Sequence, residues 1–249
     1  MKKIALVNQK GGVAKTTSTY NLAVAKAQEG KMVLMVDLDP QASLTISCGM
    51  EDKIDAENIC NVFDGMKPDE CIYKVETLGF DNLFLMPADI ELANVEMQLI
   101  TKSAREKKLK RALDQINEYF DYCFIDCPPN LGTLTMNALC CADEVIIPVK
   151  TDYLSYRGLG SLKATIEAIK EDPDLNPALQ LLGVIGTLYR SSVGKHREIL
   201  ELLSENDNLL GVIKESADVD REVHNGLPVV IAHKNSESAE VYRSIAKII

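Results

Sequence analysis

Short apolar runs alternate along this chain with longer segments whose apolar residues recur at helical spacing. The runs carry few polar residues on either face, which is typical of strands buried in a parallel sheet. The strands predicted from these runs are 4–7, 32–36, 83–86, 122–126, 144–149, 181–189 and 209–213. The helices predicted between and after them are 18–29, about 57–63, 90–101, 104–119, 158–170, 195–206 and 236–249.

Strands that alternate with helices predict an α/β fold, a doubly wound and mostly parallel sheet with helices on both faces. The chain has 249 residues and shows no repeat, linker or low-complexity tract. We therefore expect one domain that spans residues 1–249. Ligands bind such sheets at the carboxyl ends of the strands, so polar residues directly after a strand are the first candidates for a site.

A glycine loop joins the first predicted strand to the first predicted helix. Its sequence is Lys10-Gly11-Gly12-Val13-Ala14-Lys15-Thr16-Thr17. The backbone N–H groups of such a loop converge on a phosphate, and the helix N-terminus adds positive potential. Here Lys15 would reach the terminal phosphates of a nucleotide, and the Thr16 hydroxyl would bind Mg²⁺. The strict phosphate-loop pattern fails twice, because Gln9 and Ala14 stand where glycines are expected.

Acidic residues follow two other predicted strands. Asp37 and Asp39 lie in the segment D-L-D-P-Q, and Asp126 begins the segment D-C-P-P. An apolar strand that ends in a carboxylate beside a phosphate loop is typical of a magnesium site. Thr16, Asp37 and Asp126 are thus candidate metal ligands, and Asp39 is the candidate for orienting an attacking water. From the residues alone, two acids around a proline could equally serve a turn or a helix cap.

These motifs resemble those of the ParA/MinD family of deviant Walker A ATPases. The usual family loop reads K-G-G-V-G-K-T-T, and Ala14 is the departure from it here. With the D-L-D-P-Q and D-C-P-P segments and the order of elements, the chain is similar to a short, Soj-like ParA partition protein. The resemblance implies a P-loop NTPase fold, with ATP and Mg²⁺ as cofactors and the loop residues 11–17 around the phosphates. We expect a negative φ at Ala14, where one methyl group costs little.

The resemblance also assigns a role to Lys10. The family likeness implies that Lys10 reaches across a homodimer to the partner's nucleotide, so that two subunits sandwich ATP. The implied catalytic residues are Lys10, Lys15 and Asp39. Taken by itself, a lysine so near its own loop could simply be solvated.

The resemblance is less informative about the base. It implies that Thr187, at the end of a late strand, contacts the adenine. The second family segment for the base reads I-P-R-N, and the corresponding Ile213-Lys214-Glu215-Ser216 lacks that wording. We therefore assign no base contact to the second segment.

Charge limits how this chain could bind DNA. The formal net charge is -10, which argues against binding through bulk positive charge. The resemblance implies non-specific binding of double-stranded DNA through a local basic patch, and a ParB-like partner that stimulates slow hydrolysis. The candidate DNA-binding residues are Arg190, Lys195, Arg197 and Arg221. They could also be ordinary surface charges, as we interpret the basic run within 102–111.

Two other classes share this loop. A MinD-like division-site ATPase ends in a basic amphipathic helix that lies on lipid. The last helix here carries only Arg243 and Lys247 as cations, so we expect no stable membrane association. An iron–sulfur reductase would need cysteines such as Cys127 and the pair Cys140-Cys141 to face each other across a dimer.

The seven cysteines and the chain start favour a cytoplasmic protein. The cysteines include no C-x-x-C pair, so we expect reduced thiols packed as small apolar residues. The first apolar run is too short for a signal peptide, and no run is long enough to span a bilayer. The family likeness adds an expected association with the nucleoid in the ATP-bound state.

Overall fold

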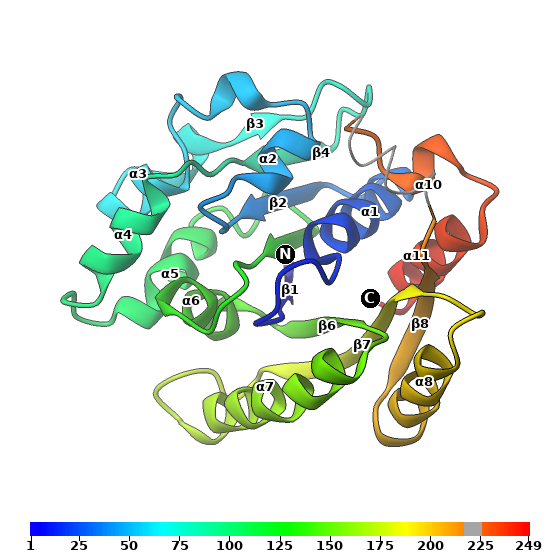
Figure 1. Ribbon diagram of the computed structural model, residues 1–249. Coiled ribbons are helices and arrows are strands. Elements are labelled where there is room, and N and C mark those ends of the chain that lie inside the picture. The colour runs from blue at the N-terminus through cyan, green and yellow to red at the C-terminus, as the bar shows by residue number, and fades with distance from the viewer. Residues whose placement is uncertain (217–225) are drawn as a thin grey trace.

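The structure is a computed structural model and describes residues 1–216 and 226–249. A β-sheet runs through its centre. Its strand order is β3-β4-β2-β5-β1-β6-β7-β8. Neighbouring strands are parallel throughout, except that β3 runs antiparallel to β4. The predicted doubly wound, mostly parallel sheet is confirmed (Figure 1).

The elements within the described residues have the following bounds. The strands are β1 Lys2–Leu6, β2 Val33–Asp37, β3 Tyr73–Lys74, β4 Leu83–Met86, β5 Tyr122–Asp126, β6 Glu144–Lys150, β7 Gln180–Tyr189 and β8 Leu209–Lys214. The α-helices are α1 Lys15–Gln28, α2 Ser43–Ser47, α3 Ile59–Asp64, α4 Leu92–Leu99, α5 Lys108–Asp114, α6 Thr133–Cys141, α7 Tyr153–Glu171, α8 Gly194–Asn206, α10 Val229–Ala232 and α11 Glu237–Ile248. Short 3₁₀ turns cover Glu51–Lys53, Pro68–Cys71 and Arg105–Lys107.

The sheet separates two hydrophobic cores. Alternate residues of a strand point to opposite faces, so β1 sends Ile4 and Leu6 to one core and Ala5 and Val7 to the other. Helices α1, α2, α10 and α11 cover the first core, and helices α3 to α8 cover the second (Figure 1). Because both faces are covered, each central strand must be apolar on both sides, which is why the strands were readable as continuous runs.

The strand order fixes where a ligand can bind. β1 lies between β5 and β6, and the connections from β1 and β5 leave toward opposite faces through α1 and α6. In open sheets of this kind, a ligand site is expected beyond the carboxyl ends of the two strands whose connections diverge. The glycine loop and Asp126 both follow strands at this point.

The structure departs from the predicted elements on both faces, and the short elements α2, α10 and β3 were not predicted. Helix α6 was not predicted, because seven of its nine residues are buried and it shows no polar stripe. Helix α7 begins at Tyr153 rather than at 158, since the Asp152 side chain accepts a hydrogen bond from the Ser155 N–H and caps it. The helix predicted at 104–119 is shorter, a 3₁₀ turn followed by α5.

The last helix uses its apolar face inside the protein. Tyr242 of α11 is fully buried, and its hydroxyl shares a hydrogen bond with Ser18 of α1 at 3.2 Å. Ile245 and Ala246 are fully buried in the same core. Among residues 1–216 and 226–249, no helix has both the length and the apolar content that crossing a bilayer requires.

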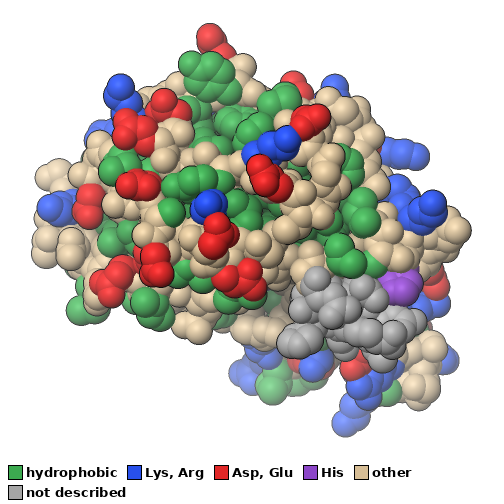
Figure 2. Space-filling model, turned by 90° about the horizontal axis from the view of Figure 1, so that it is seen from above, with side chains coloured by type: hydrophobic (Ala, Val, Ile, Leu, Met, Phe, Trp, Pro, Cys, Tyr) green, Lys and Arg blue, Asp and Glu red, His purple; other side chains and the backbone are tan. Residues whose placement is uncertain are grey.

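Charge is unevenly distributed across the sheet. Residues 51–81, around the β3 edge, hold nine acidic residues and three lysines. The view from above the molecule shows acidic side chains spread over that face (Figure 2). A polyanion would be repelled there, whereas the DNA-binding candidates Arg190, Lys195 and Arg197 lie near β7 and α8, toward the opposite edge.

Gly183 in β7 tests how closely β7 packs against the start of β8. A Cβ at Gly183 would lie 2.3 Å from the backbone oxygen of Asn208, which cannot move without shifting β8. We expect Gly183→Ala to lower the free energy of unfolding by about 2 kcal/mol in urea titrations. Gly160→Ala is the matched control, since no atom lies within 4 Å of its Cβ position in α7; an equal loss in both variants would contradict this account.

Candidate functional site

The glycine loop is anchored to the sheet on both sides. The Asn8 side chain donates to the Pro148 carbonyl at 2.7 Å and accepts from the Lys10 N–H at 3.0 Å. On the far side of the loop, the Thr187 hydroxyl donates to the Val13 carbonyl at 3.1 Å. The loop is therefore held in place by β6 and β7. Asn8 was missed from sequence, because only the tertiary structure brings Pro148 to it.

The Lys15 side chain reaches back to the start of this loop. Its side chain is nearly buried, and Nζ donates to the Lys10 carbonyl at 3.0 Å. Burial lowers the pKa of Lys15, while the charges of Asp126, Cys127 and Asp39 act in the opposite direction. An ammonium group among acids at a helix start is suited to hold a phosphate with its metal.

Asp126 meets the loop from β5. Its Oδ2 accepts from the Thr16 hydroxyl at 2.6 Å. The Thr19 hydroxyl divides its proton between Asp126 Oδ1 at 3.3 Å and the Lys15 carbonyl at 3.1 Å. Burial and the neighbouring Asp37 raise the pKa of Asp126 to about 8, against the hydrogen bond from Thr16 and the charge of Lys15. Thr19 was missed from sequence, although it lies one helical turn after Thr16 on the same face.

Asp37 lies beside Asp126, on the adjacent strand of the sheet. The two residues face each other in the register of β2 and β5, and both are fully buried. Burial raises the pKa of Asp37 to about 6, while hydrogen bonds from Thr45 and the Asp39 N–H act against the rise. Two buried carboxyl groups side by side favour either a proton or a cation between them.

These oxygens suit a magnesium ion in chemical type. Mg²⁺ prefers hard oxygen ligands, and Thr16 with Asp126 supplies a hydroxyl and a carboxylate beside the phosphate loop. Asp37 is differently placed, because its oxygens already accept from Thr45 and from the Asp39 N–H. Its role as a direct metal ligand stays a prediction.

Asp39 lies just outside the buried pair. It is half-buried, and its Oδ1 accepts from the Gln41 N–H at 3.0 Å in a local turn. Its charge acts on the pKa of Lys15, so the two side chains share one electrostatic site. The predicted role of Asp39 in orienting water therefore has the right neighbourhood and remains a prediction.

Lys10 points away from its own loop. Its Nζ lies 4.0 Å from Asp152 Oδ1 at the start of α7, and the Lys10 side chain is 33% exposed. The two lysine side chains thus have different partners: Lys10 Nζ lies near Asp152, whereas Lys15 Nζ bonds to the loop backbone.

Thr187 and the candidate DNA-binding residues lie along β7 and α8. Thr187 is fully buried under the loop, so its hydroxyl supports Val13 rather than facing an open pocket, and its contact with a base stays a prediction.

Arg190, Lys195 and Arg197 are all exposed around one turn. Within this turn the His196 ring Nδ1 accepts from the Arg190 N–H at 3.2 Å, and Arg190 is paired with Glu215. The candidate Arg221 lies outside the described residues.

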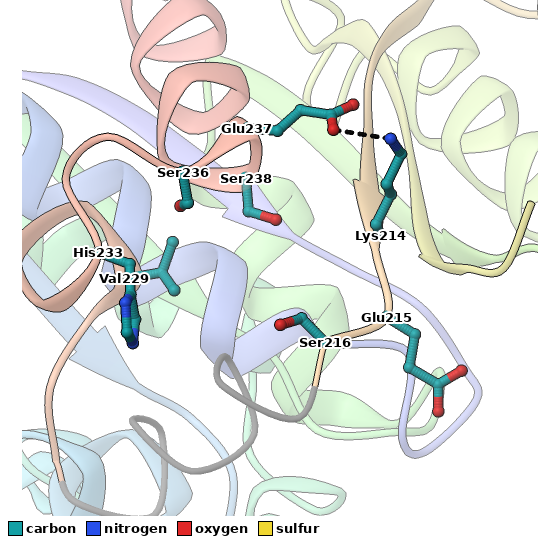
Figure 3. A pocket seen from close by; sticks show the side chains of 8 residues that line it. All are labelled: Lys214, Glu215, Ser216, Val229, His233, Ser236, Glu237 and Ser238. Atoms are coloured by element: carbon teal, nitrogen blue, oxygen red, sulfur yellow. Dashed lines mark hydrogen bonds and ion pairs between the residues drawn. The ribbon is translucent and has the colours of Figure 1, made fainter.

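A cavity of about 270 Å³ lies between the end of β8 and the start of α11 (Figure 3). Lys214 on its wall pairs with Glu237 at 2.7 Å, and the Glu215 side chain points away from the other lining residues (Figure 3). This is the segment that lacks the I-P-R-N wording. Its charged side chains are satisfied within the protein.

Comparison with known proteins identifies the family. Residues 1–181 match a family model described as an AAA domain. The sporulation initiation inhibitor protein Soj of Bacillus subtilis is 37% identical, over 99% of this chain and 97% of its own length. The chain belongs to the ParA/MinD family and is of the Soj type.

Two further relatives carry names that bear on chemistry. The chromosome-partitioning ATPase Soj of Treponema pallidum is 32% identical over 99% of this chain and 96% of its own. The crystal structure of a cobyrinic acid a,c-diamide synthase from Mycobacterium smegmatis contains ADP and magnesium. It is 34% identical, with a TM-score of 0.81 over 99% of this chain and 93% of that chain.

The ParA/MinD family loop explains why the expectation for Ala14 was wrong. Ala14 has φ 62°, in the left-handed region, whereas we expected a negative φ. The turn from β1 into α1 forces this conformation, which suits the glycine of the usual family loop. Alanine there stores strain of about 1 kcal/mol.

The buried cysteines argue against the iron–sulfur alternative within this family. Cys127, Cys140 and Cys141 are all buried inside one subunit. A cluster shared by two subunits would need these thiols at a surface. They pack instead as small apolar side chains in the second core.

The strain at Ala14 predicts an unusual stabilising substitution. We expect Ala14→Gly to raise the free energy of unfolding by about 1 kcal/mol, because glycine adopts positive φ without cost. Urea titration measures the change. Ala168→Gly, on the exposed side of α7, should instead lower it by about 1 kcal/mol. A loss of stability in both variants would show that position 14 is not strained.

Proposed function

We propose that this chain is an ATP-dependent DNA-partitioning ATPase that uses Mg²⁺. It forms an ATP-sandwich homodimer, binds double-stranded DNA without sequence preference, and hydrolyses ATP slowly until a ParB-like partner stimulates it. It acts in the cytoplasm, on the nucleoid when ATP is bound. The observation that carries this proposal is the meeting of Lys15, Thr16, Asp126 and Asp39 at one loop. The Soj-type relatives give the reaction its expected context.

The residues divide the work of phosphoryl transfer to water. Lys15 and the loop amides neutralise charge on the phosphates, and bound Mg²⁺ adds a cation that bridges them. Thr16 and Asp126 hold the metal side of the site, and Asp39 orients the attacking water. Lys10 of each subunit supplies positive charge to the nucleotide of the other, as an arginine finger does.

The surroundings of Lys10 support the dimer. Lys10 is only loosely engaged, because an ion pair at 4.0 Å between partly exposed groups is weak. Tyr153 and Leu154 directly follow Asp152 and are 63% and 65% exposed. Large apolar side chains beside a loosely held lysine suit a surface that a second copy covers. Turnover should be slow in the monomer, since the site gains its second lysine only in the dimer.

The role of Lys10 is separable from that of Lys15 by binding measurements. We expect Lys15→Ala and Lys10→Ala each to lower ATP turnover at least about 100-fold, since each removes a cation from the developing charge. Lys15→Ala should also lose nucleotide affinity, whereas Lys10→Ala should keep binding as a monomer in light scattering. Lys31→Ala, at an exposed position before β2, is the control and should behave as the wild type. Full turnover in Lys10→Ala would remove the sandwich from the proposal.

The placement of positive charge supports DNA binding by the proposed dimer. Lys195 and Arg197 project from the start of α8, at the edge of the sheet away from the acidic residues 51–81. A dimer that brought two copies of this turn together would double the local positive charge. Interactions of this kind go to phosphates and carry no sequence information.

The salt dependence of DNA affinity tests this patch. With ATP present, we expect Lys195→Ala combined with Arg197→Ala to weaken binding to random duplex and to lower the salt slope by about 1 for each phosphate that is no longer neutralised. Fluorescence anisotropy at several salt concentrations measures both quantities. Lys31→Ala serves again as the matched removal of one surface cation. Unchanged affinity and slope in the double variant would place the DNA interface elsewhere.

A further inference from the structure

Thr45 occupies a central position that the proposed reaction does not use. It lies in α2 and is fully buried. Its hydroxyl donates to Asp37 Oδ2 at 2.8 Å, and its backbone N–H donates to the same oxygen at 2.9 Å. The same hydroxyl accepts from the Ala88 N–H at 3.1 Å. One side chain therefore bridges the carboxyl end of β2 and the loop after β4.

Asp37 links Thr45 to Asp39 through hydrogen bonds. While Oδ2 of Asp37 is held by Thr45, Oδ1 accepts from the Asp39 N–H at 3.1 Å. A buried carboxylate is stable only where donors surround it, so its orientation depends on these donors. Moving the Thr45 hydroxyl would therefore move the carboxylate that fixes the backbone of Asp39.

The connection also reaches the β5 loop through α4. Asp89, next to Ala88, accepts from the Glu91 N–H at 2.7 Å and from the Asn58 side chain at 2.6 Å, which fixes the approach to α4. Farther along α4, Glu96 Oε1 accepts from the Leu134 N–H at 3.1 Å in the first turn of α6. Hydrogen bonds at three points, together with the backbone of residues 88–96, thus connect the loops after β2, β4 and β5.

A hydroxyl is the group this position needs. It is a donor and an acceptor at once, so it can give its proton to Asp37 while receiving that of Ala88. Valine has nearly the same shape and can do neither. A purely space-filling role would tolerate valine, whereas a bridging role would not.

We propose that Thr45 is a positioning residue for the nucleotide site, which acts by holding Asp37, and through it Asp39, against the loop that leads into α4. This inference rests on the proposed ATPase function. It predicts that loss of the hydroxyl impairs the use of Mg²⁺ and the chemical step, while the phosphate loop itself keeps its shape.

The test compares Thr45→Val with Thr45→Ser in the full chain. Binding of a fluorescent ATP analogue, titrated with Mg²⁺, reports on the metal side of the site without turnover. We expect Thr45→Val to raise the Mg²⁺ concentration at half-saturation about tenfold and to lower kcat about tenfold, as loss of a hydrogen bond to a charged group would. Affinity for the analogue without Mg²⁺ should stay within about threefold, and Thr45→Ser should restore both quantities to within about threefold.

Tyr242→Phe is the matched control. It also removes one buried hydroxyl, but that hydroxyl contacts Ser18 between α1 and α11 and is not bonded to a carboxylate. It should lower thermal stability and leave the Mg²⁺ titration and kcat unchanged. If Tyr242→Phe shifts both as Thr45→Val does, general loss of stability explains the effect and the proposal fails.

The remaining outcomes decide the proposal in either direction. A folded Thr45→Val protein with wild-type Mg²⁺ dependence and kcat overturns it, and so does a Thr45→Ser protein as impaired as Thr45→Val. Should Thr45→Val not fold, Thr45→Cys carries the test, because its weak thiol donor predicts an effect larger than that of serine; equal effects of serine and cysteine would then overturn it. If the wild type shows no turnover, the proposed function fails, while the Mg²⁺ titration still judges Thr45.

Discussion

The structure depends on the placement of two buried carboxyl groups beside one buried ammonium group. Asp37 and Asp126 end adjacent strands, and Lys15 lies in the loop that follows the strand on the other side of Asp126. Such charges are costly to bury unless each has a partner. The hydroxyls of Thr16, Thr19 and Thr45 supply the partners, so the local structure around the loop is largely a set of threonine hydrogen bonds to carboxylates. A nucleotide with its metal would enter a site already arranged for charge.

Two of the four non-glycine residues with positive φ in the described part of the chain lie at the same site. Ala14 precedes α1 and Ala42 precedes α2, and both adopt positive φ although neither is glycine. Each alanine comes directly before a helix that carries threonines bonded to Asp126 or Asp37. The surrounding contacts therefore hold the backbone in a conformation that the residue disfavours, as is common where geometry serves binding.

Much of the fold could be predicted from the sequence, because both faces of the sheet are covered and the strands read as apolar runs. β4 and β5 begin and end where the pattern placed them, at Leu83–Met86 and Tyr122–Asp126. The prediction was wrong where burial erased the pattern, as in α6, and where a cap lay outside it, as at the start of α7. It was also wrong for Ala14, whose φ is set by the turn between β1 and α1 and not by the preference of alanine.

The sequence by itself determined the type of site: a lysine and threonine loop, strands that end in aspartates, and the family to which these motifs belong. The reason is that each motif is local, and its chemistry follows from neighbouring residues. Only the tertiary structure decided which side chains support the site. Asn8, Thr45 and Thr187 act on groups 140, 43 and 174 positions away along the chain. Such contacts arise from the order in which strands lie side by side, and no periodicity in the chain records that order.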